Sequence, residues 1–121
     1  MKRNILKITP LGGLGEVGRN CMVYEYGENI LVVDSGLMFP ENDMLGVDYI
    51  IPDFTYLVQN RSKVRGIIIT HGHEDHTGAL PHLLAEVQAP IYSTPLTQGM
   101  LEVKLAKHGL AQKADLRTVH A

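Results

Sequence analysis

The stretch "THGHEDHTG", residues 70–78, places three histidines, one aspartate and one glutamate within six consecutive positions. It directly continues "VRGIIIT", residues 64–70, an apolar run of the kind that forms a strand buried on both faces of a sheet. Such a strand delivers the polar cluster to the carboxyl edge of a sheet, where α/β folds place their ligand sites. The stretch therefore predicts both an α/β architecture and the position of its functional site.

The residue types in this cluster are those of a metal site. His71, His73, Asp75 and His76 form an H-x-H-x-D-H pattern, and imidazole with carboxylate suits zinc and similar first-row ions. His71 and His73 can face one ion, while the adjacent Asp75 and His76 can face a second, and two neighbouring ions can clamp a hydrolytic water and its target. The alternative is a solvated turn in which Asp75 or Thr77 caps the next helix, but it leaves the histidines unexplained.

Other polar residues near the cluster are given different roles. Asp34 ends the run "ILVVD" and can orient a ligating histidine from behind, or it can be a plain turn aspartate. Glu74 is expected to point away from the metals as an exposed acid at a helix start. Three further histidines are not expected to be ligands: His82 on a helix, His108 at a helix end that favours a cation, and His120 near the chain end.

The flanking sequence predicts strands first and alternating strands and helices afterwards. Strands are expected over 4–10, ending at Pro10, and over 21–26, 29–35, 64–70, 90–94 and 116–120. Helices are expected over 55–60, 77–87 and 95–109, with Pro81 and Pro95 in first turns, Thr94 as an N-cap and Gly109 as the stop. Residues 39–54 are expected to be irregular. This pattern indicates a sheet with helices packed on it.

A glycine-rich segment, Gly13-x-Gly15-x-x-Gly18, matches the dinucleotide-binding fingerprint in its letters. That mechanism needs a helix N-terminus directly after the glycines, and the following residues, "RNCMVYEY", have a strand pattern. The segment is therefore interpreted as a tight loop between two strands. A further interpretation is that the bare backbone of Gly13 and Gly15, with the nearby Asn20, lets a substrate come close.

The composition is that of one small globular domain. The chain has 121 residues, 45% of them hydrophobic and 20% charged, with a net charge of −2. No apolar run approaches the roughly 20 residues of a membrane helix, and the amino terminus lacks the pattern of a signal peptide, so a cytoplasmic location without membrane contact is expected. Cys21 is the only cysteine, which excludes an internal disulfide and predicts a small buried side chain. The charge balance gives no support for nucleic-acid binding, although a local basic patch stays open.

Longer stretches resemble a known family. Residues 10–26, 32–57, 69–84 and 89–97, including "GLMFPENDMLGVDYIIPDF" at 36–54, are together similar to the amino-terminal part of the bacterial ribonuclease J family. That family belongs to the β-CASP branch of the metallo-β-lactamase superfamily. The histidine motif marks only the superfamily, whereas the glycine loop and residues 36–54 are the more specific parts.

The resemblance implies a fold and a chemistry. The fold would be the amino-terminal half of a metallo-β-lactamase αββα sandwich, with a β-rich start. The longer parent would be a zinc-dependent ribonuclease, homo-oligomeric, cutting RNA internally and from a 5′-monophosphate end by means of a metal-activated water. His71 and His73 would bind one zinc, Asp75 and His76 the other, and Asp34 would support the site. Asp75 and His76 would also count as catalytic, and Mn²⁺ or Mg²⁺ could replace zinc.

The same resemblance implies that this chain is incomplete. The family completes its site with a third histidine, a bridging aspartate and a late histidine, none of which is recognisable here. Residues 1–121 would form a partial metallo-β-lactamase domain without the β-CASP and carboxyl-terminal domains, inactive alone. Its sheet would expose an apolar face and self-associate. The alternatives are another hydrolase of this superfamily acting on a thioester, lactone or lactam, a non-catalytic metal-binding module, and a nucleotide-binding module that uses the glycine loop.

Overall fold

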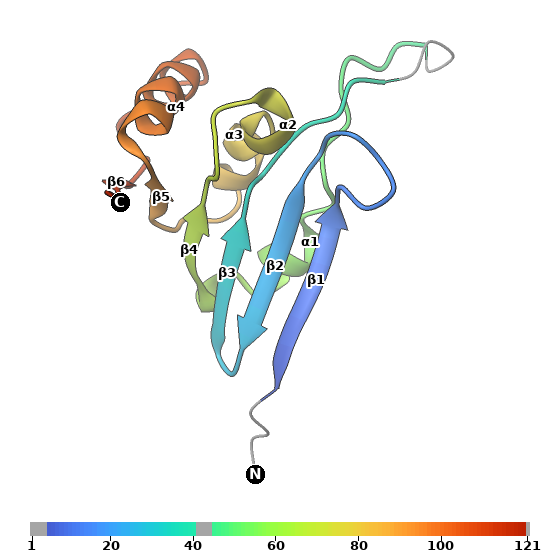
Figure 1. The fold of residues 1–121 in the computed structure, drawn as a ribbon, viewed down its shortest axis with the longest axis vertical. Coiled ribbons are helices and arrows are strands. Elements are labelled where there is room, and N and C mark those ends of the chain that lie inside the picture. Colours follow the sequence, from blue (N-terminus) through green and yellow to red (C-terminus); the bar gives the residue numbers. More distant parts are fainter. Residues whose placement is uncertain (1–4, 41–44, 121) are drawn as a thin grey trace.

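The computed structural model describes residues 5–40 and 45–120, and in it one mixed sheet carries helices on one side (Figure 1). The strand order is β1-β2-β3-β4-β5-β6. The strands are β1 (Leu6–Gly12), β2 (Cys21–Tyr26), β3 (Asn29–Val33), β4 (Val64–Ile68), β5 (Ile91–Ser93) and β6 (Leu116–Thr118). The helices are α1 (Thr55–Gln59), α2 (Glu74–Thr77), α3 (Leu80–Leu84) and α4 (Pro95–Lys107), with a 3₁₀ turn at Arg61–Lys63. The predicted α/β class is confirmed, and no described helix is long and apolar enough to span a membrane.

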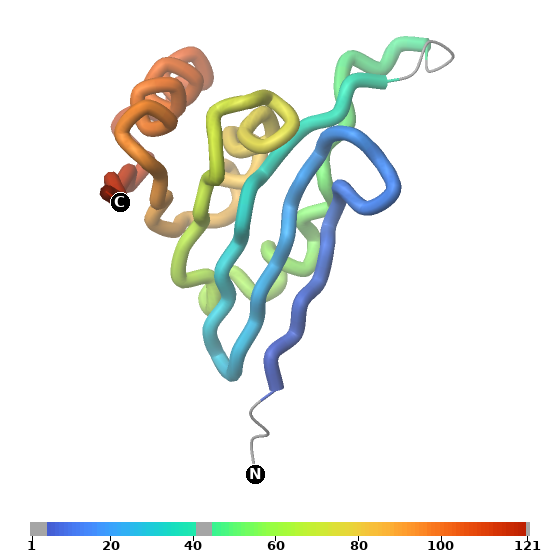
Figure 2. Tube along the Cα trace, in the orientation of Figure 1, coloured from blue at the N-terminus to red at the C-terminus, as the bar shows by residue number. Residues whose placement is uncertain are grey.

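The sheet changes from antiparallel to parallel pairing at β3. β1 pairs antiparallel with β2 and β2 with β3, while β3 to β6 pair parallel. The β2–β3 hairpin turns at Gly27, whose φ of +61° suits glycine. Each parallel connection then crosses one face of the sheet through helical residues, as the course of the chain shows (Figure 2). The carboxyl ends of β3, β4 and β5 consequently lie along one edge, and "THGHEDHTG" begins there.

Two sequence predictions about element limits are wrong. β1 does not end at Pro10 but continues to Gly12 with an irregularity in register; β1 is an edge strand, where the missing proline N–H costs no ladder bond. The helix expected over 77–87 is two short helices, α2 and α3. The break lies at Ala79, whose N–H donates to the carbonyl of Ser35 at 2.9 Å and not within the helix. Pro81, which has no N–H, then lies in the first turn of α3.

The alternative in which Asp75 or Thr77 caps the next helix is not what the structure shows. α2 begins at Glu74 with His73 in the N-cap position, and no side chain caps it. The Thr77 hydroxyl instead donates back to the His73 carbonyl at 3.1 Å. Thr94 does occupy the N-cap position of α4, and Pro95 opens that helix as predicted.

The core lies between the sheet and the helices. Buried side chains alternate along the strands, and those of Val23, Val32 and Ile67 meet Leu57 of α1 and Leu83 of α3. Alternation of this kind is the signature of a sheet that is covered on one side.

The other side of the sheet presents an apolar surface. Paired residues on this side are Leu6 with Tyr26, Ile8 with Tyr24, and Tyr24 with Leu31. We call these five side chains the open face. Leu6, Ile8 and Tyr26 are 57%, 55% and 49% exposed, and Leu31 and Tyr24 are 40% and 36% exposed. The helices lie behind the sheet from this side (Figure 1). The predicted apolar face is therefore present on the described part of the chain.

We predict that the open face makes the chain self-associate, because a contiguous apolar surface of this kind is uncommon on a free monomer. Replacing Ile8 and Leu31 together by lysine places charge on that surface and should shift the sedimentation profile towards monomer, while the unchanged chain forms larger species as concentration rises. Leu96→Lys is the matched control, since Leu96 is 79% exposed on α4. A purely monomeric unchanged chain would contradict the prediction.

Candidate metal centre

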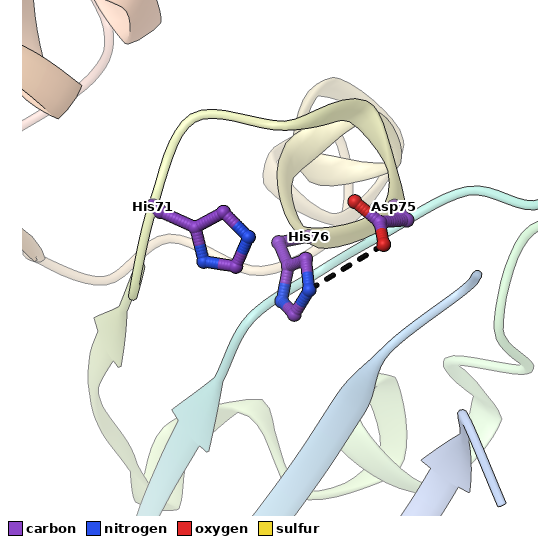
Figure 3. Close-up of side chains that lie close together, drawn as sticks. All are labelled: His71, Asp75 and His76. Carbon is purple, nitrogen blue, oxygen red and sulfur yellow. Dashed lines mark ion pairs between the residues drawn. The ribbon is translucent and has the colours of Figure 1, made fainter. Parts of the chain in front are cut away.

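The candidate centre lies where β3 and β4 end. β3 passes into Asp34, which has a φ of +66°, a region that aspartate tolerates better than most residues. β4 passes through Thr70 to His71, and α2 then supplies Asp75 and His76. The side chains of His71, Asp75 and His76 lie close together above the strand ends (Figure 3).

A ladder of backbone hydrogen bonds fixes α2 against the segment that follows β3. The N–H of Ser35 donates to the carbonyl of His76 at 2.8 Å, and that of Leu37 donates to the carbonyl of Glu74 at 3.0 Å. Between them, a Cβ atom on Gly36 would lie 1.7 Å from the carbonyl oxygen of Asp75. Only glycine fits this contact, so Gly36 allows the ligand-bearing turn to approach the end of β3 this closely.

Asn20 ties the glycine loop to the same turn. Its backbone N–H and its side-chain Nδ2 both donate to the carbonyl oxygen of Asp75, at 3.0 and 2.9 Å. The carbonyl of Asn20 accepts from the N–H of Gly36 at 2.9 Å. Asn20 therefore acts on the position of Asp75 through the backbone.

Asp34 orients His76. The Asp34 side chain is buried, and its Oδ2 lies 2.8 Å from Nδ1 of His76. Its Oδ1 accepts the backbone N–H of Thr70 at 2.8 Å. With Nδ1 carrying the proton donated to this carboxylate, Nε2 of His76 keeps its lone pair for a metal ion.

Thr70 is a site residue that sequence reasoning missed. Its hydroxyl donates to the Asp34 carboxylate, with Oδ2 at 2.8 Å, and lies 3.0 Å from Nδ1 of His71. Because the hydroxyl proton is used on Asp34, the His71 ring donates from Nδ1 and turns its Nε2 lone pair outward. The available signal was a hydroxyl residue closing an apolar strand immediately before His71.

The structure gathers three of the four predicted ligands. One ligand atom from each of His71, Asp75 and His76 lies within 4.8 Å of the others. The ring centroids of His71 and His76 are 3.9 Å apart, and Nε2 of His76 is 3.5 Å from Oδ2 of Asp75, the contact drawn dashed in Figure 3. We call these three residues the ligand group. His73 lies outside it, exposed, with its ring edge-on to His71 at 4.9 Å. The assignment of pairs to separate ions stays a prediction.

The residues expected to stand apart do so. Glu74 is exposed at the start of α2 and forms an ion pair with Lys104 of α4. The His82 ring packs at 5.3 Å from the ring of Tyr49. His108 follows α4 and is exposed, as is His120. None of the four belongs to the ligand group found among the described residues.

The glycine loop borders the ligand group. A hollow of about 190 Å³ is lined by Gly13 and Asn20 on one side and by Asp34 and His76 on the other. Gly15 is not among its lining residues. The loop runs from β1 into the antiparallel β2, so no helix N-terminus follows the glycines, and the arrangement that a dinucleotide pyrophosphate requires is missing here.

Cys21 lines the inner end of this hollow and is buried, as predicted. Burial raises the pKa of its thiol to about 12, and the neighbouring charge of Asp34 acts in the same direction.

We predict that Cys21 does not react with Ellman's reagent at pH 8 in the folded chain and reacts once denaturant is added, because the folded thiol stays protonated. The same pKa implies that the folded state loses stability as pH rises from the unfolded value of about 8.5. Fast reaction in native buffer would contradict the buried placement.

The chain is similar in sequence to known proteins. The Metallo-beta-lactamase superfamily profile matches residues 14–116. The chain is 44% identical over 120 residues to "Ribonuclease J 1" of Streptococcus pyogenes, covering 99% of this chain and 21% of that protein. It is 54% identical over 105 residues to "Ribonuclease J" of Helicobacter pylori, covering 87% of this chain and 15% of that protein. The chain thus spans about a fifth or less of the length of these relatives.

The structural comparison concerns the fold. A diphosphatase of the PhnP family superposes with a TM-score of 0.55 at 20% identity, over 84% of this chain and 38% of that chain. At this identity the likeness shows a shared architecture and says nothing of substrate.

Proposed function

The chain belongs to the metallo-β-lactamase superfamily, and on that premise we propose that it is the amino-terminal part of a zinc-dependent ribonuclease that hydrolyses RNA phosphodiesters. The observation that carries the proposal is the ligand group, in which Asp34 and Thr70 set the orientation of two histidines. The identity of 44% and 54% to proteins named ribonuclease J supports the choice of substrate. Because those proteins are about five times longer or more, the activity is proposed for the longer protein, and the isolated chain is expected to be inactive.

The donor set fits zinc. Nε2 of His71, Nε2 of His76 and a carboxylate oxygen of Asp75 are the ligand atoms that borderline-soft divalent ions accept. His73, beside His71, is proposed as the fourth ligand of a complete site that holds two ions, one with His71 and His73 and one with Asp75 and His76. Bound there, zinc supplies activation of a water and polarisation of the phosphodiester.

The chain's own residues contribute orientation and charge. Asp34 holds the proton at Nδ1 of His76 and thereby keeps Nε2 available, and Thr70 does the same for His71. The hollow bordered by Gly13 and Asn20 gives a phosphodiester access to His76, because the glycine presents only backbone there. Asn20 holds the Asp75 backbone, so the carboxylate approaches the histidines from a fixed turn.

We predict that the isolated chain binds at most one zinc ion tightly and that Asp34→Asn weakens this binding. Loss of the carboxylate removes the acceptor that orients His76, which typically costs 10- to 100-fold in metal affinity. The measurement is a competition titration with a chromophoric chelator on gel-filtered protein. Asp115→Asn is the control, since Asp115 is exposed and bonds to Arg117. Equal affinity in the two variants would contradict the orienting role of Asp34.

A chimera tests the proposed activity. These 121 residues would replace the matching 120-residue segment of the Streptococcus pyogenes relative, to which they are 44% identical. We expect the folded chimera to hydrolyse 5′-monophosphorylated RNA in a chelator-sensitive manner, and His76→Ala to abolish the hydrolysis. The isolated chain should show none. A folded chimera with bound zinc and no hydrolysis of RNA would overturn the proposed function.

A further inference from the structure

A groove separates the ligand-bearing turn from α4. Its volume is about 360 Å³, and it is lined on one side by Gly72 and Glu74 and on the other by residues of α4 from Met100 to Lys107 and by His108, which follows the helix. Gly72 and Glu74 are the chain neighbours of His71 and Asp75, and consecutive Cα atoms are about 3.8 Å apart. The turn that carries the ligand group therefore forms one wall of the groove, although His71, Asp75 and His76 are not among the lining residues.

Two contacts hold α4 against the turn. A Cβ atom on Gly72 would lie 2.4 Å from Sδ of Met100, so the α4 side chain rests on bare backbone. Glu74 forms an ion pair with Lys104, whose side chain is only 18% exposed. These two contacts fix α4, one wall of the groove, against the turn that carries the ligand group.

The groove has an apolar part and a cationic part. Met100 and Val103 give it an apolar lining, and Lys104, Lys107 and His108 lie on the side nearest the end of α4. Glu74 offsets the charge of Lys104, while Lys107 has no carboxylate partner among the described residues. The groove is locally cationic on a chain whose net charge is −2.

We propose that this groove binds single-stranded RNA, receiving the nucleotide next to the phosphodiester held at the ligand group. The inference rests on the proposed function, whose substrate it places. Grooves that bind single strands combine cations for the phosphates with surfaces on which a base can lie. Lys107 meets the phosphate, Met100 and Val103 contact the base, and the His108 imidazole offers a stacking surface.

The test measures RNA binding in the isolated full chain without divalent ions, so that no hydrolysis occurs. The probe is a 10-nucleotide single-stranded RNA with a 5′-monophosphate and a 3′-fluorophore, followed by fluorescence anisotropy at several salt concentrations. Lys107→Glu should weaken binding by roughly tenfold and lower the slope of log K against log salt by about 0.7, the loss of one phosphate contact. Lys113→Glu is the matched control, with the same charge change on an exposed residue outside the groove.

Each outcome decides the proposal. No binding by the unchanged chain, or equal weakening in the Lys107→Glu and Lys113→Glu variants, overturns it. Polyglutamate competing as well as unlabelled RNA would also overturn it, because the groove would then be a general anion site. Binding that depends on Lys107 in a chain whose chimera does not hydrolyse RNA would uphold the groove and reject the proposed activity. The two proposals therefore fail separately.

Discussion

The carboxylate of Asp34 is the constraint on which the site depends. It is buried and negatively charged, and a buried charge is stable only when its oxygens are fully engaged. Both oxygens have partners: Oδ1 accepts the backbone N–H of Thr70 at 2.8 Å, and Oδ2 lies 2.8 Å from Nδ1 of His76. The same bonds join the end of β3 to the end of β4 and to α2. One side chain thus closes the sheet edge and sets the imidazole orientation, so the fold and the chemistry cannot be altered independently at this position.

The sequence was most informative where a single physical signal dominated. The apolar run 64–70 followed by H-x-H-x-D-H identified a strand and its polar carboxyl end. The expected burial of both faces of this strand was wrong: Ile67 and Ile69 are buried, but Ile68 is only partly buried because the sheet is covered on one side. The sequence was least informative where tertiary contact decides. At the break between α2 and α3 the Ala79 N–H donates to the carbonyl of Ser35, and those residues are far apart in sequence. Likewise, the role of Thr70 needs the position of Asp34 across the sheet edge, which a linear pattern does not reveal.

The two faces of the sheet differ in what covers them. One face buries a continuous core against α1 and α3, and it accounts for the regular alternation along β2 and β3. The open face is equally apolar but exposed, with Leu6 and Ile8 both more than half accessible. Exposed apolar area of this size contributes nothing to stability until it is covered. The asymmetry agrees with a chain that spans 21% of a longer relative.

The three members of the ligand group come from one short segment of the chain. His71, Asp75 and His76 lie within six residues, so bringing them together requires closing only a small loop, and the associated entropy cost is low. Ligands from distant parts of a longer chain would need a folded scaffold before they could contribute. The hydrogen bonds from Asp34, Thr70 and Asn20 orient the side chains and the turn of this ligand group. On the proposed function, an ion that binds to this preorganised ligand group stabilises the folded state to which it binds.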